Sequence, residues 1–450
     1  MRVPGTARVG HMTSDAATGA REFDRARESD GAREFDGARE FDLVVFGATG
    51  FVGELTARYL ADHAPEGTRI ALAGRSEAKL LAVRERIGGP AAAWPVLVAD
   101  ADSPASLDAM VARTRVVCTT VGPYLKYGEA LVVAAATAGT DYVDLTGEVP
   151  FVRFSIDKAH DLAAASGARI VHSCGFDSIP SDLSVWALYR KISDDDAGQL
   201  TDTTFVLQSF RGGVSGGTID SVRVIAEQAK DAQVRRLMLN PQALSSGPGA
   251  PPRAGIGSEP SDLNIVSARK VDPSLSGTLA PFFMASHNTR IVRRSNTLLD
   301  NAYGENFHYG ETMNVGDIPV VSAVAAGLVG VGTSAFLGAM SFGPTRRLLD
   351  RMLPAPGEGP TQTARDKGHF TAEAFTTSTT GRRYRSRFRA WGDPGYKATA
   401  VMLGESALAL ALDRDKLPDH HGVLTPAVAM GDALTARLNA AGFSIDAVAL

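Results

Sequence analysis

The residues with the clearest chemical meaning are three evenly spaced glycines near the start of the chain. The apolar run 41–46 precedes them, and residues 54–60 after them have the composition of a helix. Glycine permits a tight turn and close backbone approach, and the free amides at a helix start face a diphosphate. Ordinary turns also contain such glycines, so the flanking strand and helix carry the inference. The expected ligand is NAD, NADP or FAD, held by Gly47, Ala48, Thr49, Gly50, Phe51, Val52 and Gly53.

The end of the second predicted strand indicates which dinucleotide binds. The apolar run 69–73 leads into Gly74, Arg75 and Ser76, where a site for NAD would carry an acidic residue. An acid accepts hydrogen bonds from the ribose hydroxyls and repels a 2′-phosphate, whereas a guanidinium and a hydroxyl match a phosphate. Arg75 and Ser76 therefore favour NADP. The alternative is that Arg75 is a solvated side chain at the start of the next helix, 77–87.

Further apolar runs, separated by helical patterns, predict a doubly wound parallel sheet with helices on both faces. These runs cover residues 94–99, 116–121, 142–145 and 168–173. Ligands of such sheets bind beyond the carboxyl ends of the strands. Asp100 is therefore expected to meet the adenine, and Thr120, Gly122 and Pro123 to line the nicotinamide side. Asp100 could equally cap the helix that follows it.

The composition is that of a soluble-type chain with material for two domains: 450 residues, 44% hydrophobic and 21% charged, with a net charge of −4. This balance does not indicate a nucleic-acid partner. Cys118 and Cys174 lie far apart in apolar runs, which fits a reducing, cytoplasmic setting. Without a His-Glu-x-x-His or a paired Cys motif, no metal is predicted. Residues 1–40 repeat an Arg-Glu-Phe-Asp unit and are expected to form a disordered tail.

Three longer motifs carry a family resemblance. They are Val121–Tyr124 with Tyr127 and Gly128, then Gly139–Glu148, and Cys174–Asp182. With these motifs, the chain from about Phe41 to its C-terminus resembles the saccharopine dehydrogenase-like family. Within that family it is most similar to the trans-acting enoyl reductases, which work beside polyketide synthases in making long waxy lipids.

The resemblance implies both an architecture and an activity. It implies an NADP-binding Rossmann domain over 41–190, a second α+β domain with a mixed sheet over 191–391, and a segment 392–450 that returns to the first domain. It also implies an NADPH-dependent enoyl reductase for a lipid-like acyl chain, which a carrier protein or polyketide synthase could deliver, and a homo-oligomer is a further expectation. Two alternatives stay open: a saccharopine-type amino-acid dehydrogenase, which needs clustered arginines for carboxylates, and a non-enzymatic NADP-binding scaffold at lipid surfaces.

The proton donor is harder to identify than the cofactor site. Short-chain reductases use a Tyr-x-x-x-Lys pair, and the chain has no such pair after the fourth strand. Enoyl reduction needs hydride at the β-carbon and a proton at the α-carbon of the resulting enolate. Tyr124 is the first candidate for donor or positioning residue, followed by Tyr127 and Asp177 with Ser178. The alternatives are that the tyrosines only pack and that Asp177 caps the following helix.

Two other segments suggest contacts with lipids or partners. Residues 318–344 contain no charged side chain. We expect this segment to line a tunnel or dip into a membrane surface, with a helix buried between domains or subunits as the alternative. A predicted hairpin places Arg385, Arg387 and Arg389 on one strand face, where they could meet an acidic carrier protein, although a solvated strand face is the commoner outcome.

Overall fold

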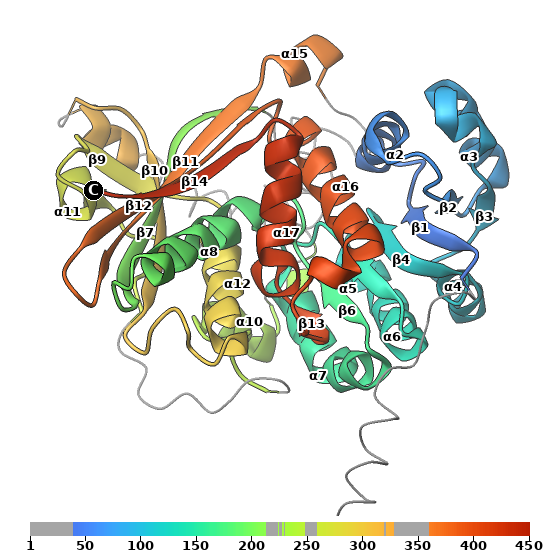
Figure 1. The fold of residues 1–450 in the computed structure, drawn as a ribbon, viewed down its shortest axis with the longest axis horizontal. Coiled ribbons are helices and arrows are strands. Elements are labelled where there is room, and N and C mark those ends of the chain that lie inside the picture. The colour runs from blue at the N-terminus through green and yellow to red at the C-terminus, as the bar shows by residue number, and fades with distance from the viewer. Residues whose placement is uncertain are drawn as a thin grey trace, which may run out of the picture. The chain divides into compact units, whose positions relative to one another are not determined.

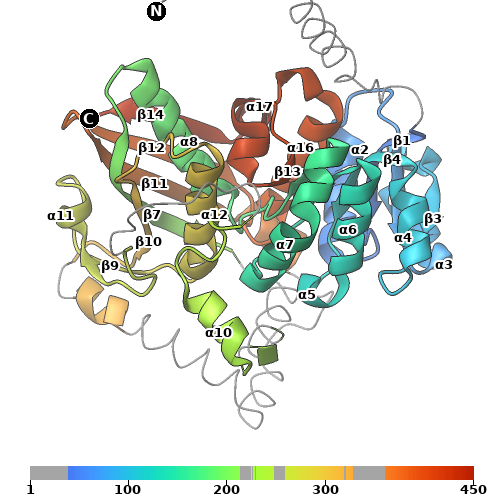
Figure 2. The ribbon, with the colours of Figure 1, turned by 90° about the horizontal axis from the view of Figure 1, so that it is seen from below.

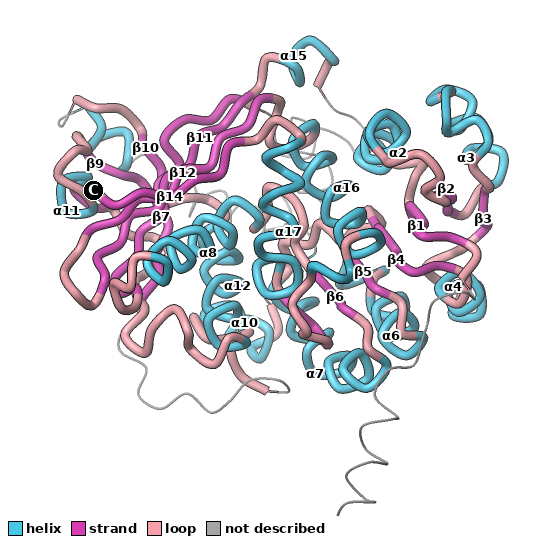
Figure 3. The backbone as a smooth tube through the Cα atoms, viewed as in Figure 1, coloured by secondary structure: helices cyan, strands magenta, loops and turns pink. Residues whose placement is uncertain are grey.

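The structure is a computed structural model that describes residues 39–212, 230–247, 259–318, 321–327 and 360–450, together with residues 224, 227 and 228. Most of the predicted tail, 1–40, lies outside this range. Residues Glu40–Leu450 form one compact unit. Its strands gather into two sheets, which are drawn as two separate magenta groups in Figure 3.

The first sheet has seven strands that all pair in parallel, in the order β13-β6-β5-β4-β1-β2-β3 (Figure 1). Its strands are β1 (Phe41–Phe46), β2 (Ile70–Gly74), β3 (Val96–Val98), β4 (Thr114–Thr119), β5 (Asp141–Val143), β6 (Arg169–Val171) and β13 (Gly422–Leu424). The predicted runs 94–99 and 168–173 contain β3 and β6, whereas β4 and β5 overlap the runs 116–121 and 142–145 but begin one or two residues before them.

Helices cover both faces of this sheet, because successive side chains of a strand point to opposite faces. Leu43 and Val45 of β1 pack in one core cluster with α2 (Phe51–His63), α3 (Glu77–Ile87) and α16 (Lys397–Leu412). Val44 and Phe46 pack in another with α4 (Pro104–Val111), α6 (Glu129–Ala138) and α7 (Val149–Ser166). Figure 2 shows α6 and α7 side by side. This arrangement confirms the predicted doubly wound sheet.

The second sheet is mixed, as expected. Its order is β14-β12-β11-β7-β10-β9-β8, and only β7 and β10 pair in parallel. The strands are β7 (Leu200–Arg211), β8 (Val266–Ser267), β9 (Thr278–Pro281), β10 (His308–Asn314), β11 (His369–Ser378), β12 (Arg383–Trp391) and β14 (Ser444–Ala449). Helix α8 (Ile179–Asp194) packs on β7, β11, β12 and β14, and α12 (Ala285–Leu298) packs on β10 and α8.

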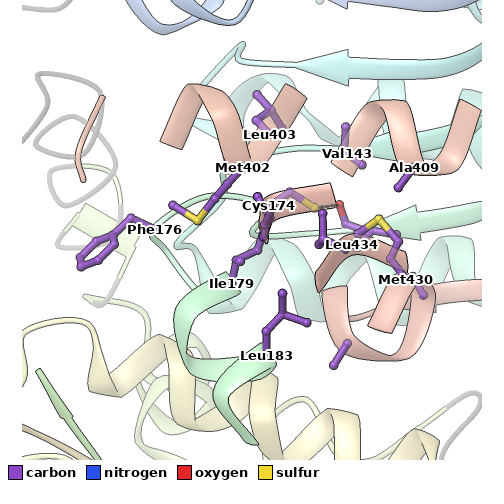
Figure 4. Close-up of a cluster of buried hydrophobic side chains, with 14 of the residues drawn as sticks. Val143, Cys174, Phe176, Ile179, Leu183, Met402, Leu403, Ala409, Met430 and Leu434 are labelled. Carbon is purple, nitrogen blue, oxygen red and sulfur yellow. Dashed lines mark hydrogen bonds between the residues drawn. The ribbon is translucent and has the colours of Figure 1, made fainter. Parts of the chain in front are cut away.

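The C-terminal segment contributes to both sheets. Helix α16 packs on β1, β4 and β5, and β13 extends the first sheet beside β6. After α17 (Pro426–Ala440), the last strand β14 crosses to pair with β12 of the second sheet. Apolar side chains from α8, α16 and α17 meet in one cluster, including Ile179, Met402 and Leu434 (Figure 4). The remaining short helices are α5 (Tyr124–Tyr127), α10 (Ala232–Leu239), α11 (Ala268–Val271), α15 (Gln362–Asp366), η1 (Gly89–Ala93) and η2 (Arg414–Lys416).

The arginine stripe expected on β12 is partly neutralised. Arg385 and Arg387 lie on one face, as the alternation predicts, but both pair with Glu373 of β11, at nitrogen–oxygen distances of 3.6 Å and 2.7 Å. Arg389 of the same stripe is exposed.

Most of the uncharged segment 318–344 lies outside the described residues, which include only Ile318 and the helical residues 321–327. Among the helices that can be described, none has both the length and the apolar composition required to cross a membrane.

Candidate active site

The glycine turn between β1 and α2 has a geometry that only glycine permits at two positions. Gly47 has a φ of +89°, in the left-handed region. A Cβ atom on Gly53 would lie 2.1 Å from the carbonyl oxygen of Gly47. The first turn of α2 therefore packs directly against the backbone of the turn, and its amides have no acceptor within the helix. This is the cradle that a diphosphate requires.

The carboxyl end of β4 lies directly beside this turn. The amide of Thr120 donates to the carbonyl oxygen of Phe46 over 3.0 Å, and its hydroxyl donates to that of Gly47 over 3.3 Å. Gly122 is exposed and joins Pro123 through a cis peptide bond. Thr49 and Gly50 are exposed as well, whereas Ala48 is fully buried under the turn. The structure thus brings the predicted nicotinamide-side residue Thr120 against the glycine turn.

The residues predicted to bind the adenosine half follow β2 and β3. Arg75 is exposed, and no hydrogen bond or ion pair joins its side chain to any other residue that the structure describes. The Ser76 hydroxyl accepts from the amide of Lys79 over 3.4 Å and so caps α3. Asp100 does not cap α4, because the cap position is Ser103. The Asp100 carboxylate instead accepts the amide of Asp102 over 3.1 Å, in the turn after β3.

Tyr124 is buried and its hydroxyl has two backbone partners. The hydroxyl donates to the carbonyl oxygen of Thr119 over 3.2 Å and accepts the amide of Leu145 over 3.1 Å, which ties the end of β4 to the loop after β5. Burial, with a smaller contribution from nearby Asp144, raises the pKa of Tyr124 well above its usual value. These contacts favour positioning over proton donation. Tyr127 is half-buried, with the Lys126 ammonium 4.8 Å from its ring centre.

Asp177 lies in the loop between β6 and α8. Burial raises its pKa from 3.8 to about 7, and the negative charge of Asp144 adds to the effect. The cap position of α8 is Ser178, whose hydroxyl donates to Asn288 of α12 over 3.0 Å, so Asp177 is not the cap. No hydrogen bond joins the Asp177 carboxyl to another of the described residues. A half-buried carboxyl that keeps its proton near neutral pH suits a general acid.

A buried carboxylate that the sequence reasoning did not select, Asp144, organises the loops after β5 and β6. One oxygen accepts the amides of Thr146 and Ser173, at 3.0 Å and 2.9 Å. The other accepts the Tyr142 hydroxyl at 2.9 Å and lies 2.7 Å from Nδ1 of His172. These contacts hold Ser173 at a φ of +63°, which a side chain other than glycine rarely adopts. Asp144 directly follows β5 in the sequence, and this position just past a strand is a signal that could have identified it.

Glu148 and two residues of α12 were missed as well. The fully buried Glu148 carboxylate accepts the amides of Tyr124 and Leu125, at 3.0 Å and 2.9 Å, and so fixes the start of α5. From α12, which packs on the second sheet, His287 Nε2 lies 2.8 Å from the Ser173 hydroxyl, and Asn288 contacts Ser178. No signal in the sequence could have found this contact, because α12 is polar along its length and yet almost fully buried.

Comparisons with known proteins show the family of this chain. Residues 43–171 match the family model of the saccharopine dehydrogenase NADP binding domain. The chain is 55% identical, over 91% of its own length and 97% of the relative's, to a protein of Mycobacterium tuberculosis (strain H37Rv) provisionally named a trans-acting enoyl reductase. It is 50% identical, over 89% and 96%, to a trans-acting enoyl reductase of Mycobacterium bovis (strain BCG).

Among solved structures, saccharopine dehydrogenase (L-Glu forming) from Saccharomyces cerevisiae matches 91% of this chain and 99% of that chain, with 15% sequence identity and a TM-score of 0.49. The family rests on the sequence relatives, whose identity and coverage are high along almost the whole chain. The chain belongs to the saccharopine dehydrogenase family, in the group of the mycobacterial trans-acting enoyl reductases.

Proposed function

We propose that the protein is an NADPH-dependent reductase that saturates the enoyl group of an acyl or polyketide chain in complex-lipid synthesis. The observation that carries the proposal is the glycine turn, where Gly53 lets the first turn of α2 contact the backbone of Gly47. This geometry fits a dinucleotide diphosphate. The names of the relatives support the enoyl substrate and a polyketide synthase as the source of that substrate.

The choice of NADPH over NADH rests on Arg75. Its exposed guanidinium follows β2, whose residue Ala73 accepts the amide of Gly47 over 2.9 Å, so Arg75 and the glycine turn lie at the same edge of the sheet. Arg75→Ala should weaken NADPH binding by about 10- to 150-fold, because a hydrogen bond to a charged group contributes about 1.5–3 kcal/mol. NADH should bind nearly as before.

The matched control is Lys79→Ala, which removes one exposed positive charge a turn further along α3. Isothermal titration of both variants with NADPH and NADH measures the effect. Arg75 would be excluded as the 2′-phosphate ligand if Arg75→Ala lost affinity equally for NADPH and NADH. It would also be excluded if Lys79→Ala lost as much NADPH affinity as Arg75→Ala.

Asp177 is the proton donor in this proposal. Bound NADPH supplies a hydride to the β-carbon of the substrate. As the double-bond electrons move toward the thioester oxygen, the α-carbon takes the proton of the Asp177 carboxyl, which solvent later restores. The pKa of about 7 leaves about half of this carboxyl protonated at pH 7, so the acid form is available at neutral pH. The Tyr124 hydroxyl holds the neighbouring loops through Thr119 and Leu145, and Tyr127 remains a second candidate.

The direct test follows the loss of nicotinamide absorbance when the protein is mixed with NADPH and 2-enoyl thioesters. Turnover that yields the saturated thioester supports the proposal. Turnover only with saccharopine-type amino-acid substrates would instead support an amino-acid dehydrogenase. Cofactor binding without any turnover would support a non-enzymatic scaffold.

The proposal extends to peripheral membrane contact through residues 318–344 of a cytoplasmic protein. Ile318, Val321 and Val324 support the contact, since they are 65%, 59% and 61% exposed and the last two share one helix face. The reducing cytoplasm fits Cys118 and Cys174, both buried free thiols. Flotation of the protein with anionic lipid vesicles tests the contact, and recovery of all protein in the unbound fraction would refute it. Delivery by a carrier protein and a homo-oligomer stay predictions.

A further inference from the structure

Three aromatic side chains form a continuous row that begins beside Asp177. Phe176 is the residue before Asp177 and is 8% exposed. Its ring centre lies 6.1 Å from that of Phe210 at the end of β7, which in turn lies 6.4 Å from that of Phe283. Phe283 precedes α12 and is 44% exposed. We call Phe176, Phe210 and Phe283 the aromatic row.

The inner end of the aromatic row belongs to the core, and its outer end does not. Phe176 packs on Phe370 of β11, with ring centres 4.8 Å apart. The residue beside Phe283 supplies the core contact at the outer end, because Phe282 is 3% exposed and packs on Phe205. The Phe283 ring packs edge-on against Phe282, with ring centres 4.8 Å apart, and leaves its other side exposed. An exposed ring that continues an apolar surface from a reactive group marks a contact for an apolar ligand.

Gly147 and Met284 mark the contact between the loop after β5 and the residues that follow Phe283. Gly147, in the loop after β5, is half-buried, and a Cβ added to it would have only one neighbour within 4 Å, the terminal methyl of Met284 at 3.6 Å. Met284 follows Phe283 directly and is also half-buried. The loop after β5 and the start of α12 thus meet through small or flexible apolar groups. Methionine adapts its shape to a chain of variable length.

We propose that the acyl chain of the substrate lies along the aromatic row, with its thioester end at Asp177 and its distal methylenes against Phe283. This inference rests on the proposed function and adds to it a specificity-determining residue, Phe283. Each methylene that the row removes from water strengthens binding by about fourfold. Affinity and kcat/KM should therefore rise with chain length until the chain passes Phe283.

The test compares wild type, Phe283→Ser and a control, Trp391→Ser, with thioesters of four to sixteen carbons. Trp391 is 77% exposed at the end of β12, outside the row, so its replacement removes an exposed aromatic ring of similar size. Phe283→Ser should lower kcat/KM for the longest chains on the order of tenfold, through KM, and leave the four-carbon substrate unchanged. Trp391→Ser should follow wild type at every length. Melting temperatures check that both variants fold.

A parallel measurement separates this inference from the proposed function. Calorimetric binding of saturated acyl thioesters of the same lengths needs no turnover. If long chains bind more weakly to Phe283→Ser but wild type reduces no enoyl thioester, the acyl chain does bind along the aromatic row and the enoyl reductase proposal fails. If wild type reduces enoyl thioesters but Phe283→Ser changes kcat/KM equally for all chain lengths or for none, binding of the acyl chain along the aromatic row is refuted. That binding is also refuted if wild-type affinity does not depend on chain length.

Discussion

The contact between Gly53 and Gly47 makes Gly53→Ala the most direct test of the cofactor site. An alanine Cβ would lie 2.1 Å from the carbonyl oxygen of Gly47, 2.8 Å from its carbonyl carbon and 2.8 Å from the hydroxyl oxygen of Thr120. Two of these three atoms belong to the backbone, so no side-chain rotation relieves the clash. The start of α2 must move away from the turn by roughly 1 Å or more to restore ordinary contact distances.

That displacement sets the expected size of both effects. Overpacking of this kind costs about 1–3 kcal/mol of folding stability. A helix amide that donates to a phosphate at about 2.9 Å leaves hydrogen-bond range after a shift of roughly 1 Å. Loss of one such bond to a charged group, at about 1.5–3 kcal/mol, weakens binding by about 10- to 150-fold. NADH and NADPH should lose the same factor, because the diphosphate is common to both.

Isothermal titration with both cofactors and a urea melt measure these changes. The control is Gly404→Ala on α16, which also presses on α2, but at the side chain of Tyr59, 2.7 Å from the added Cβ. A ring can shift and the site lies away from the turn, so this variant should lose stability without losing cofactor affinity. The reasoning would be refuted if Gly53→Ala bound both cofactors like wild type, or if Gly404→Ala lost affinity equally.

Two further predictions concern carboxyls whose pKa burial raises to about 7. We expect the wild-type rate to fall above pH 7 as Asp177 loses its proton. Asp177→Asn should lower kcat by about 10²- to 10⁴-fold and abolish this fall, and a variant that kept the fall would exclude Asp177 as the acid. Asp182 should affect stability instead: its folded pKa exceeds the value of 3.8, so the folded state binds more protons and the free energy of unfolding falls as pH rises from about 4 to about 7. Asp182→Asn should remove its own share of this fall in urea melts, because Asp177 and Glu311, whose pKa burial also raises to about 7, contribute the rest. An unchanged pH dependence would count against the prediction.

The sequence predicted the first sheet well because its signals are local. Each buried parallel strand is a short apolar run, and the turn after β1 needs glycine at Gly47 for its positive φ and at Gly53 for close packing. The positions of Arg75 and Thr120 could be predicted for a similar reason, because a residue just past a strand lies at the ligand edge of the sheet. The strand ends were less predictable: the run 116–121 continues past β4, where Thr120 and Val121 turn to meet the glycine loop.

The loops around Asp177 depended on contacts between residues far apart in the chain. Asp144 gathers donors from Tyr142, His172 and Ser173, and the last two lie almost thirty residues further along the chain. The burial of helix α12 could not be predicted for a different reason. A buried helix normally consists mainly of apolar residues, but polar side chains of α12 bind distant carbonyls and acids. Arg294, for example, donates to the carbonyl oxygens of Leu244 and Val423.

The direction of one hydrogen bond determines the protonation state of His287, where α12 contacts the loop after β6. The Ser173 hydroxyl lies 2.7 Å from the carbonyl oxygen of Thr146 and 2.8 Å from Nε2 of His287. Since the hydroxyl has one proton and the carbonyl can only accept, Ser173 donates to Thr146 and His287 donates to Ser173. Burial lowers the pKa of His287 to about 3, which keeps the ring neutral. The second contact, between Ser178 and Asn288, also joins neutral groups. Neither hydrogen bond itself titrates near pH 7, but two carboxyls that bind α12 do: Asp182 accepts the Ser295 hydroxyl, Glu311 accepts the Asn288 amide, and burial raises the pKa of each to about 7. A fall in rate above pH 7 would therefore be assigned to the Asp177 proton only if Asp177→Asn removed it and Asp182→Asn kept it.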